Sequence, residues 1–273
     1  MRNATRIIDQ YGNPNPVTTD YRIKTACSDF GYDLTRGYAP NTTHVSKMGY
    51  NGDIDANEED LWAVGGTYIF PAENQQMEVV SSSTDDSGNG TGARTVQIWY
   101  LDSSFNEYTE TLTLNGTTPV PTVATNIYRI NFFRVATAGT GGKAAGNIDI
   151  RNLSDTPIYS RIPATLTRAR NAIYTVPKGK TLYITQMTYS IGSSVGNIFG
   201  TFSLRATYCE ISGTHCDLFY PFSEIGVQDG PFTIVFSIPM KFVSGCDLRV
   251  LCKGDSAAAN GIATSQFRGW LEW

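Results

Sequence analysis

Acid–base catalysis by histidine has few candidate residues, because the 273 residues contain two histidines, His44 and His215. Residues 192–196 (GSSVG) match the G-x-S-x-G pattern of hydrolase nucleophile elbows. That pattern works where a strand turns sharply into a helix, whereas residues 198–209 alternate in polarity as a strand does. We therefore interpret the motif as a hairpin turn.

A second glycine-rich segment, residues 139–143 (GTGGK), is similar to part of a phosphate-binding loop. Thr137 and Ala144 stand where that loop needs a glycine and a hydroxyl residue. A glycine-rich turn between two strands explains the segment better.

Residues 53–57 (DIDAN) begin like a calcium-binding EF-hand loop. The sixth position, which needs glycine, is Glu58, and the twelfth, which needs glutamate, is Val64. An acidic turn is the simpler interpretation. A calcium site of another kind stays open as an alternative, with the ligands Asp53, Asp55 and Asp60.

The five cysteines are an odd number, so they cannot all pair within one chain, and we expect a reducing compartment. Cys246 and Cys252 lie on one face of a predicted strand about 20 Å apart, too far to share a zinc ion. We expect both in the core. Cys209 and Cys216 could face each other across a hairpin, which leaves a disulfide or metal pair open. We predict no cofactor, no metal and no enzymatic activity.

The composition predicts an all-β protein. Charged residues make up 17% of the chain, and the polar surface is left to abundant Thr, Ser, Asn and Gly. The net charge of −4 argues against a nucleic-acid partner, since phosphate binding needs clustered Lys and Arg. No run of about 18 apolar residues predicts a membrane helix, and the start of the sequence lacks the apolar core of a signal peptide.

Alternation with a period of two predicts strands over most of the sequence, first in the segments 95–101, 108–114 and 126–135. A polar run, 81–92, is expected to be an exposed and mobile loop. Similar openings, YIFP at 68–71 and YTVP at 174–177, suggest a duplication. We therefore expect two tandem antiparallel β-sandwich domains of the jelly-roll type, 59–156 and 157–273.

Residues 1–58 lack a sustained period and are broken by Pro and Gly, so only short strands could fit there. The segment is nevertheless rich in aromatic residues, which disordered tails usually lack. We expect an extended N-terminal arm that contacts its own domain or a neighbouring subunit. Its candidate interface residues are Tyr11, Tyr21, Phe30, Tyr32 and Tyr38.

Between residues 60 and 190 the chain resembles structural proteins of tailed-bacteriophage virions. The resemblance rests on VVSSSTDDSGNGTGARTVQIWYLDSSFNEYTETLTLNGTTPV at 79–120, INFFRVATAG at 130–139 and IYTVPKGKTLYIT at 173–185. It is strongest at GTGAR (90–94) and LTLNG (112–116). None of these residues has a catalytic role that could be transferred, so the resemblance implies membership of a virion.

Within that group the resemblance favours a capsid decoration (cement) protein, which implies a homotrimer on the outer capsid surface bound to the major capsid protein. Such a protein would be made in the host cytoplasm. A neck or tail component is the alternative in the same class. The alternative from another class is a β-sandwich that binds glycans or a receptor, with the exposed aromatic candidates Trp99, Trp270 and Trp273.

Overall fold

The computed structural model describes residues 30–193, 196–209, 212–255 and 261–273. It divides into two compact units, 1–40 and 41–273. The first contributes one short helix, α1 (Phe30–Thr35), to the described part. All sixteen described strands belong to the second unit, and every strand pair is antiparallel. The prediction of an all-β protein is confirmed.

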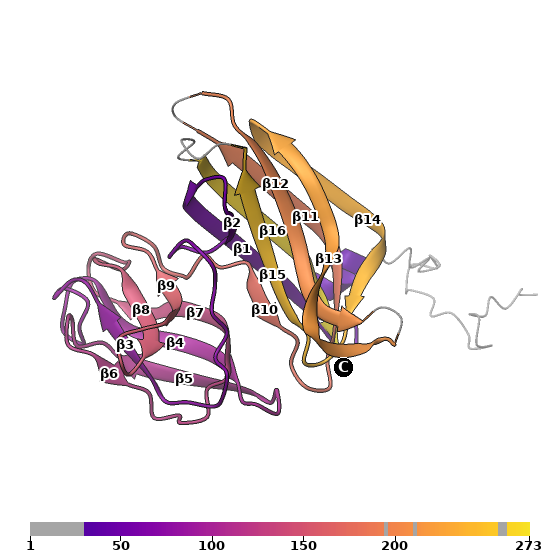
Figure 1. The fold of residues 1–273 in the computed structure, drawn as a ribbon. Coiled ribbons are helices and arrows are strands. Elements are labelled where there is room, and N and C mark those ends of the chain that lie inside the picture. The colour runs from indigo at the N-terminus through magenta and orange to yellow at the C-terminus, as the bar shows by residue number, and fades with distance from the viewer. Residues whose placement is uncertain (1–29, 194–195, 210–211, 256–260) are drawn as a thin grey trace, which may run out of the picture. The chain divides into compact units, whose positions relative to one another are not determined.

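Two sheets hold the longest strands (Figure 1). The first has the order β1 (Thr42–Ile54), β16 (Gly261–Glu272), β11 (Thr181–Gly192), β14 (Gly230–Phe242). The second has the order β10 (Ile173–Thr175), β15 (Asp247–Gly254), β12 (Phe199–Cys209), β13 (Thr214–Gln228), and β2 (Glu58–Asp60) also pairs with β15.

Apolar residues that alternate along these strands meet in one core. Tyr189 of β11, Phe202 of β12 and Phe267 of β16 are among its fully buried side chains. Each buried side chain of this size stabilises the fold by about 1.5–3 kcal/mol through the area it removes from water. The core therefore holds the two sheets together as a sandwich.

The middle of the chain forms two smaller sheets (Figure 1). One has the order β6 (Val120–Pro121), β3 (Met77–Ser81), β8 (Ile148–Asn152), β9 (Ile158–Ile162). The other has the order β5 (Glu107–Thr113), β4 (Ala93–Leu101), β7 (Arg129–Ala138). Their apolar side chains, among them Met77, Ile98 and Ile148, form a separate core.

The middle segment interrupts one edge strand of the larger sandwich. Strands β2 and β10 pair with consecutive stretches of β15, since Asp60 lies opposite Leu251 and Ile173 lies opposite Arg249. Between these pairs, Leu61 N–H donates to the Val250 carbonyl (2.9 Å). Val250 N–H donates in turn to the Ala172 carbonyl (3.1 Å), so β10 continues the line of β2.

The two ends of the interruption lie side by side. Ala172 N–H donates to the Leu61 carbonyl (2.9 Å), and Trp62 forms an antiparallel bridge with Asn171. Residues 62–171 are thus inserted between two halves of one strand. We call them the insert, and we call β1, β2 and β10–β16 the main sandwich.

The expected arrangement of two sandwiches in tandem differs from this strand pairing. Strands β1 and β2, which come before the insert in the chain, complete the same sheets as β16 and β15, which come after it. The expected arm over 1–58 also overlaps β1, a strand of 13 residues, where only short strands were expected. The buried positions of β1 explain the error, because they are Val45, Lys47, Gly49, Asn51 and Ile54, of which only the first and last are apolar side chains.

Candidate functional site: the junction of the insert and the main sandwich

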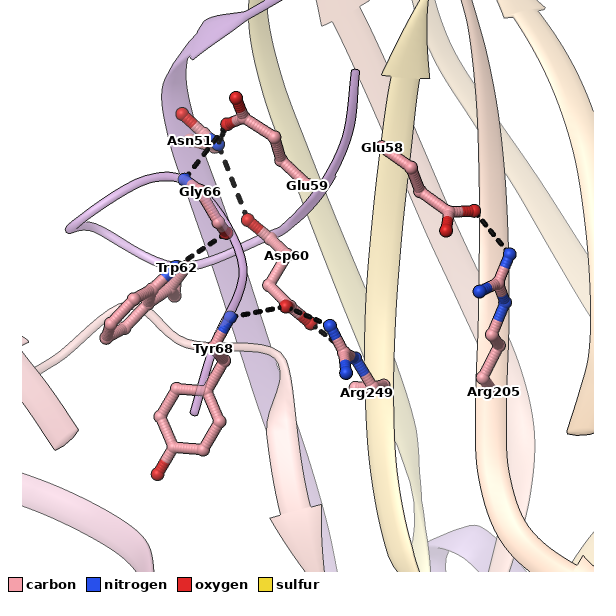
Figure 2. Close-up of polar contacts among 9 residues, drawn as sticks. All are labelled: Asn51, Glu58, Glu59, Asp60, Trp62, Gly66, Tyr68, Arg205 and Arg249. Carbon is pink, nitrogen blue, oxygen red and sulfur yellow. Dashed lines mark hydrogen bonds and ion pairs between the residues drawn. The ribbon is translucent and has the colours of Figure 1, made fainter. Parts of the chain in front are cut away.

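The first turn of the insert is fixed by Asp60, whose side chain is fully buried (Figure 2). Its carboxylate accepts hydrogen bonds from Nε of Arg249 (2.8 Å), from a second guanidinium nitrogen and from Tyr68 N–H (2.7 Å). Burial raises the pKa of Asp60, and the neighbouring Arg249 opposes that shift. The carboxylate ties the start of the insert to β15.

A second carboxylate shapes the loop that follows (Figure 2). Glu59 accepts hydrogen bonds from Asn51 Nδ2 (2.6 Å) and Gly66 N–H (3.0 Å), and the indole of Trp62 donates to the Gly66 carbonyl (3.1 Å). Gly66 has a φ of 68°, in the left-handed region that glycine adopts at little cost. The Asn51–Glu59 contact binds this loop to β1.

These contacts bear on the calcium alternative. The Asp60 carboxylate faces Arg249, and Oδ1 of Asp55 accepts a hydrogen bond from Asn57 N–H (2.6 Å). Within the described residues no group of three or more His, Cys, Asp or Glu side chains could hold a metal ion. The structure therefore does not bring Asp53, Asp55 and Asp60 together as ligands.

A buried ion pair joins β7 of the insert to β15. The Arg129 guanidinium contacts both carboxylate oxygens of Asp247 at 2.9 Å, and the Thr175 hydroxyl donates to the same carboxylate (2.5 Å). The two charged side chains are 9% and 8% exposed. Two parallel hydrogen bonds to one carboxylate fix the orientation of both partners.

Next to this pair, the side chain of Asn131 in β7 forms hydrogen bonds with the backbone of β10. Its amide donates to the Thr175 carbonyl (2.8 Å), and its side-chain oxygen accepts from Thr175 N–H (2.9 Å). Lys47 of β1 reaches the same place, where Nζ donates to the Asn131 carbonyl (2.5 Å) and to Asn171 Oδ1 (2.7 Å). Burial, with a smaller contribution from Arg168, lowers the pKa of Lys47 to about 7.

A cavity of about 460 Å³ opens beside Lys47, between residues of β1 and β7. Its lining includes the aromatic residues Trp99, Phe132 and Tyr174 and the cationic residues Lys47, Arg134, Arg168 and Lys180. A second cavity of about 370 Å³ lies at the loop described above and is lined by Asp53, Glu59 and Gly65, among other residues.

The aromatic residues predicted for subunit contacts are partly outside the described chain. Tyr11 and Tyr21 lie outside the described residues. Phe30, Tyr32 and Tyr38 are 43%, 58% and 65% exposed, and the Arg36 guanidinium lies over the rings of Tyr32 and Tyr38. Their part in subunit contacts stays a prediction.

The three tryptophans proposed for glycan binding lie at different places. Trp99 lines the larger cavity, with the Arg134 guanidinium 4.6 Å from its ring centroid. Trp270 stacks on Tyr183 with ring centroids 5.1 Å apart, and Trp273 is 54% exposed. Lys180, which also lines the larger cavity, has its Nζ 5.4 Å from the Trp273 ring centroid. A role of the three in glycan binding stays a prediction.

Two sequence motifs take different places from those expected. Strand β11 ends at Gly192 and strand β12 begins at Phe199, and the two belong to different sheets, so they do not pair as a β-hairpin. Residues 194–195 of the GSSVG motif lie outside the described residues. The polar run 81–92 contains Asp86, which is fully buried and accepts hydrogen bonds from three backbone N–H groups, so the run is not simply an exposed loop.

The four cysteines in the described part of the chain have free thiols. Cys246 and Cys252 are fully buried, as expected for core residues, and burial raises the pKa of each thiol to about 12. Cys209 and Cys216 lie across the β12–β13 hairpin, where a hydrogen bond between the two thiols raises the pKa of Cys209. The register places Cys209 opposite Thr214, and both thiols are free, so the disulfide left open by the sequence is not formed.

An exposed apolar surface on β13 and β14 was missed by the sequence analysis. Its most exposed members are Leu218 (65%), Val235 (73%) and Ile238 (84%), with Tyr220 and Phe232 also exposed. Alternation in these strands suggested one buried and one wet face. Both strands lie at sheet edges, and these apolar side chains are exposed on them.

No known protein-family model matches the chain, and no curated protein matches it in sequence. Solved structures with some likeness include two of infectious bursal disease virus, a T13 particle and the Gx strain, both 11% identical. They cover 88% and 85% of this chain and 78% and 80% of the other, with TM-scores of 0.18 and 0.16. TM-scores this low establish no shared fold. No described helix is long and apolar enough to cross a membrane.

Proposed function

We propose that the chain is a structural protein of a tailed-phage virion, and that it acts as a decoration (cement) protein. In this proposal it binds the assembled shell as a homotrimer, on the outer surface, against the major capsid protein. Two things support it: the resemblance of residues 60–190 described above, and the exposed apolar surface of β13 and β14, which carries the proposal. A partner that binds only the assembled lattice stabilises that state by mass action.

The strand order supports the architectural part of the proposal. If β2 and β10 count as one interrupted strand, the main sandwich has eight strands. Numbered along the chain, its sheets have the orders 1-8-3-6 and 2-7-4-5, which is the order of a jelly roll. We propose one jelly roll that carries the insert in its second strand.

The apolar surface supports the self-association. Exposed apolar patches of this kind on a water-soluble protein mark interaction sites. The 28 residues of β13 and β14 include only three Asp, Glu, Lys or Arg residues, namely Asp217, Glu224 and Lys241. A surface with so few charges can meet a second copy of itself without burying unpaired charges.

Both edge strands, β13 and β14, have features that hinder the addition of another β-strand. The pairing of β11 with β14 skips residues 236–239, which bulge from the sheet and end at Pro239. The pairing of β12 with β13 is interrupted next to Pro221. Bulges and prolines at an edge prevent another strand from adding to it. The proposed contact is therefore made by side chains such as Val235 and Ile238.

The test replaces Val235 and Ile238 together by Lys, with Val123→Lys as the control. Val123 is 88% exposed and lies in the insert, so the control adds a charge at an equally exposed valine away from the proposed surface. We expect the double variant to fold and to lose both the trimer and binding to shells, while V123K keeps both. An unchanged oligomer and unchanged shell binding in the double variant would refute this surface.

Copy number separates a decoration protein from a neck or tail component. A decoration protein is present in many copies over the shell, whereas a neck or tail component is confined to one vertex. Imaging of particles with quantification of the chain per virion distinguishes the two. Labelling confined to the tail would overturn the placement on the capsid and leave the structural role intact.

A further inference from the structure

The larger cavity at the junction has an unusual balance of charge. Four cationic side chains line it, Lys47, Arg134, Arg168 and Lys180. Its one acidic lining residue, Glu107, is already paired with Lys180 at 2.8 Å. Among the described residues, no carboxylate pairs with any of the other three cations.

Lys47 is the most constrained of them. Its side chain is 4% exposed, and Nζ donates two hydrogen bonds, to the carbonyl of Asn131 and to Asn171 Oδ1. An ammonium group has three N–H donors. Neutral acceptors satisfy two of these donors, and the nearby Phe132 ring, whose centroid lies 4.8 Å from Nζ, is also uncharged. The buried ammonium therefore has no counter-charge.

Arg134 and Arg168 add two further positive charges to the lining of the cavity. Arg134 of β7 and Arg168 form an isolated antiparallel bridge, so they lie directly opposite each other. Like charges at opposed positions of two strands destabilise the pairing. Arg168 also lowers the pKa of Lys47, which shows that its charge acts on the ammonium. A bound anion would relieve this repulsion.

The remaining walls combine apolar and aromatic side chains with the polar residues Thr43, His44, Ser46 and Asn171. Trp99 and Phe132 meet edge to face with centroids 6.2 Å apart, and Val45, Met48 and Leu271 complete the lining around Lys47. Ligand pockets commonly have volumes of about 300–1,000 Å³ and combine apolar walls with a few placed polar groups. The cavity, at about 460 Å³, has this composition.

We propose that this cavity binds a small carboxylate carried on a ring, with the carboxylate held by Lys47 and Arg168 and the ring against Trp99 and Phe132. A guanidinium matches the two oxygens of a carboxylate in one plane. The site lies at the junction and away from β13 and β14, so it goes beyond the structural role proposed above.

Calorimetric titration of the full chain with matched probe pairs tests the proposal. Glucuronate is compared with glucose, and benzoate with benzyl alcohol, so that each pair differs in the carboxylate and keeps the ring. Inorganic sulfate tests whether charge alone is enough. We expect at least one carboxylate to bind, its neutral partner to bind at least tenfold more weakly, and sulfate to bind more weakly than that carboxylate. The preferred pair shows whether the ring is a sugar or an aromatic group.

Variants locate the binding. Arg168→Gln changes an exposed side chain and should fold; we expect it to weaken carboxylate binding about tenfold. Lys143→Gln removes a cation from an exposed loop outside the cavity and should leave binding unchanged. Lys47→Met should weaken binding further and remove its pH dependence, since wild-type affinity should fall as the pH rises through about 7, where Lys47 loses its charge.

Several results would overturn the proposal: no carboxylate binds, a neutral partner binds as tightly, sulfate binds as tightly as the carboxylates, or R168Q and K143Q have equal effects. The Val235 and Ile238 double variant separates this site from the proposed function. It should bind the carboxylate normally even if it no longer assembles.

Discussion

The main sandwich and the insert have similar architectures, but they rely to different extents on apolar packing and on polar contacts. Both consist of two antiparallel sheets around a core, and the two cores are separate clusters of side chains. The main sandwich has strands of up to 15 residues, whereas the longest strand of the insert has 10. The shorter strands leave more of the insert in turns, so polar contacts carry more of its order.

Buried polar groups dominate the connection between the two regions. A small apolar cluster around Trp62, Tyr68 and Ile173 contributes, but the contacts that fix geometry are the Arg129–Asp247 pair and the Asn131–Thr175 hydrogen bonds. Polar contacts depend strongly on direction, whereas apolar packing tolerates sliding. The polar contacts at the junction therefore fix the orientation of the insert on the main sandwich more than they add stability.

The largest effect should come from breaking the buried ion pair with Arg129→Met. The substitution leaves Asp247 buried without a counter-charge, which costs about 3–5 kcal/mol of unfolding free energy. Urea unfolding measures the loss. The control, Lys180→Gln, removes a more exposed ion pair and should cost at most about 1 kcal/mol. Equal losses in the two variants would contradict the central place given to the buried pair.

Cavity-forming substitutions in each core should show whether the two regions unfold separately. Ile98→Ala in the insert and Phe267→Ala in the main sandwich should cost about 2–5 and 3–5 kcal/mol respectively, because both side chains are fully buried. Hydrogen exchange of I98A should speed up in β3–β9 and stay near wild type in β11 and β16. A uniform increase over all strands would show a single cooperative unit.

The pH dependence of stability should report on Lys47. Its pKa is lowered by burial from the ordinary value of 10.5 to about 7 in the folded protein, so the unfolded chain holds a proton that the folded chain lacks between these values. Stability should therefore rise with pH from about 7 to 10.5, by up to about 1.4 kcal/mol per pH unit. Urea unfolding of wild type and K47M isolates this contribution, and parallel curves for the two would refute it.

The smallest effect is expected at the exposed aromatic residues before β1. Tyr38→Ser should change the unfolding free energy of the chain by no more than about 0.5 kcal/mol, because the ring is 65% exposed and contacts the exposed Arg36. Thermal unfolding checks this. A loss of more than 1 kcal/mol would show that the ring packs on a surface not accounted for here.

Strands were predictable where apolar residues alternate. In β4 and β11 the buried positions are mainly Val, Ile, Leu, Met and Tyr, so the period of two is visible in the sequence. It is hidden in β1, where two buried positions are polar. Lys47 has its partners, Asn131 and Asn171, in the insert, and Asn51 has its partner, Glu59, in β2. Gly49 is there because a Cβ would overlap the Leu61 carbonyl and Ala172. Such requirements come from residues far along the chain.

Contacts between residues far apart in the sequence also explain why the junction and the loop at Asp86 were not predicted. The insert is defined by the contact of Leu61 with Ala172, 111 positions apart, which no local pattern indicates. Asp86 sits in a run of polar residues that resembles an exposed loop, yet its carboxylate accepts hydrogen bonds from the N–H groups of Ala93, Ala145 and Gly146. The candidate cavity likewise combines Lys47, Trp99 and Arg168 from separate segments.

The mass of the purified chain in solution shows whether copies of the chain associate. The proposed function requires copies of the chain to meet through β13 and β14. Light scattering on the wild-type protein should give the mass of three 29.9-kDa chains, and the Val235 and Ile238 double variant should give that of one. A wild-type protein that remains at 29.9 kDa at all accessible concentrations would contradict the account.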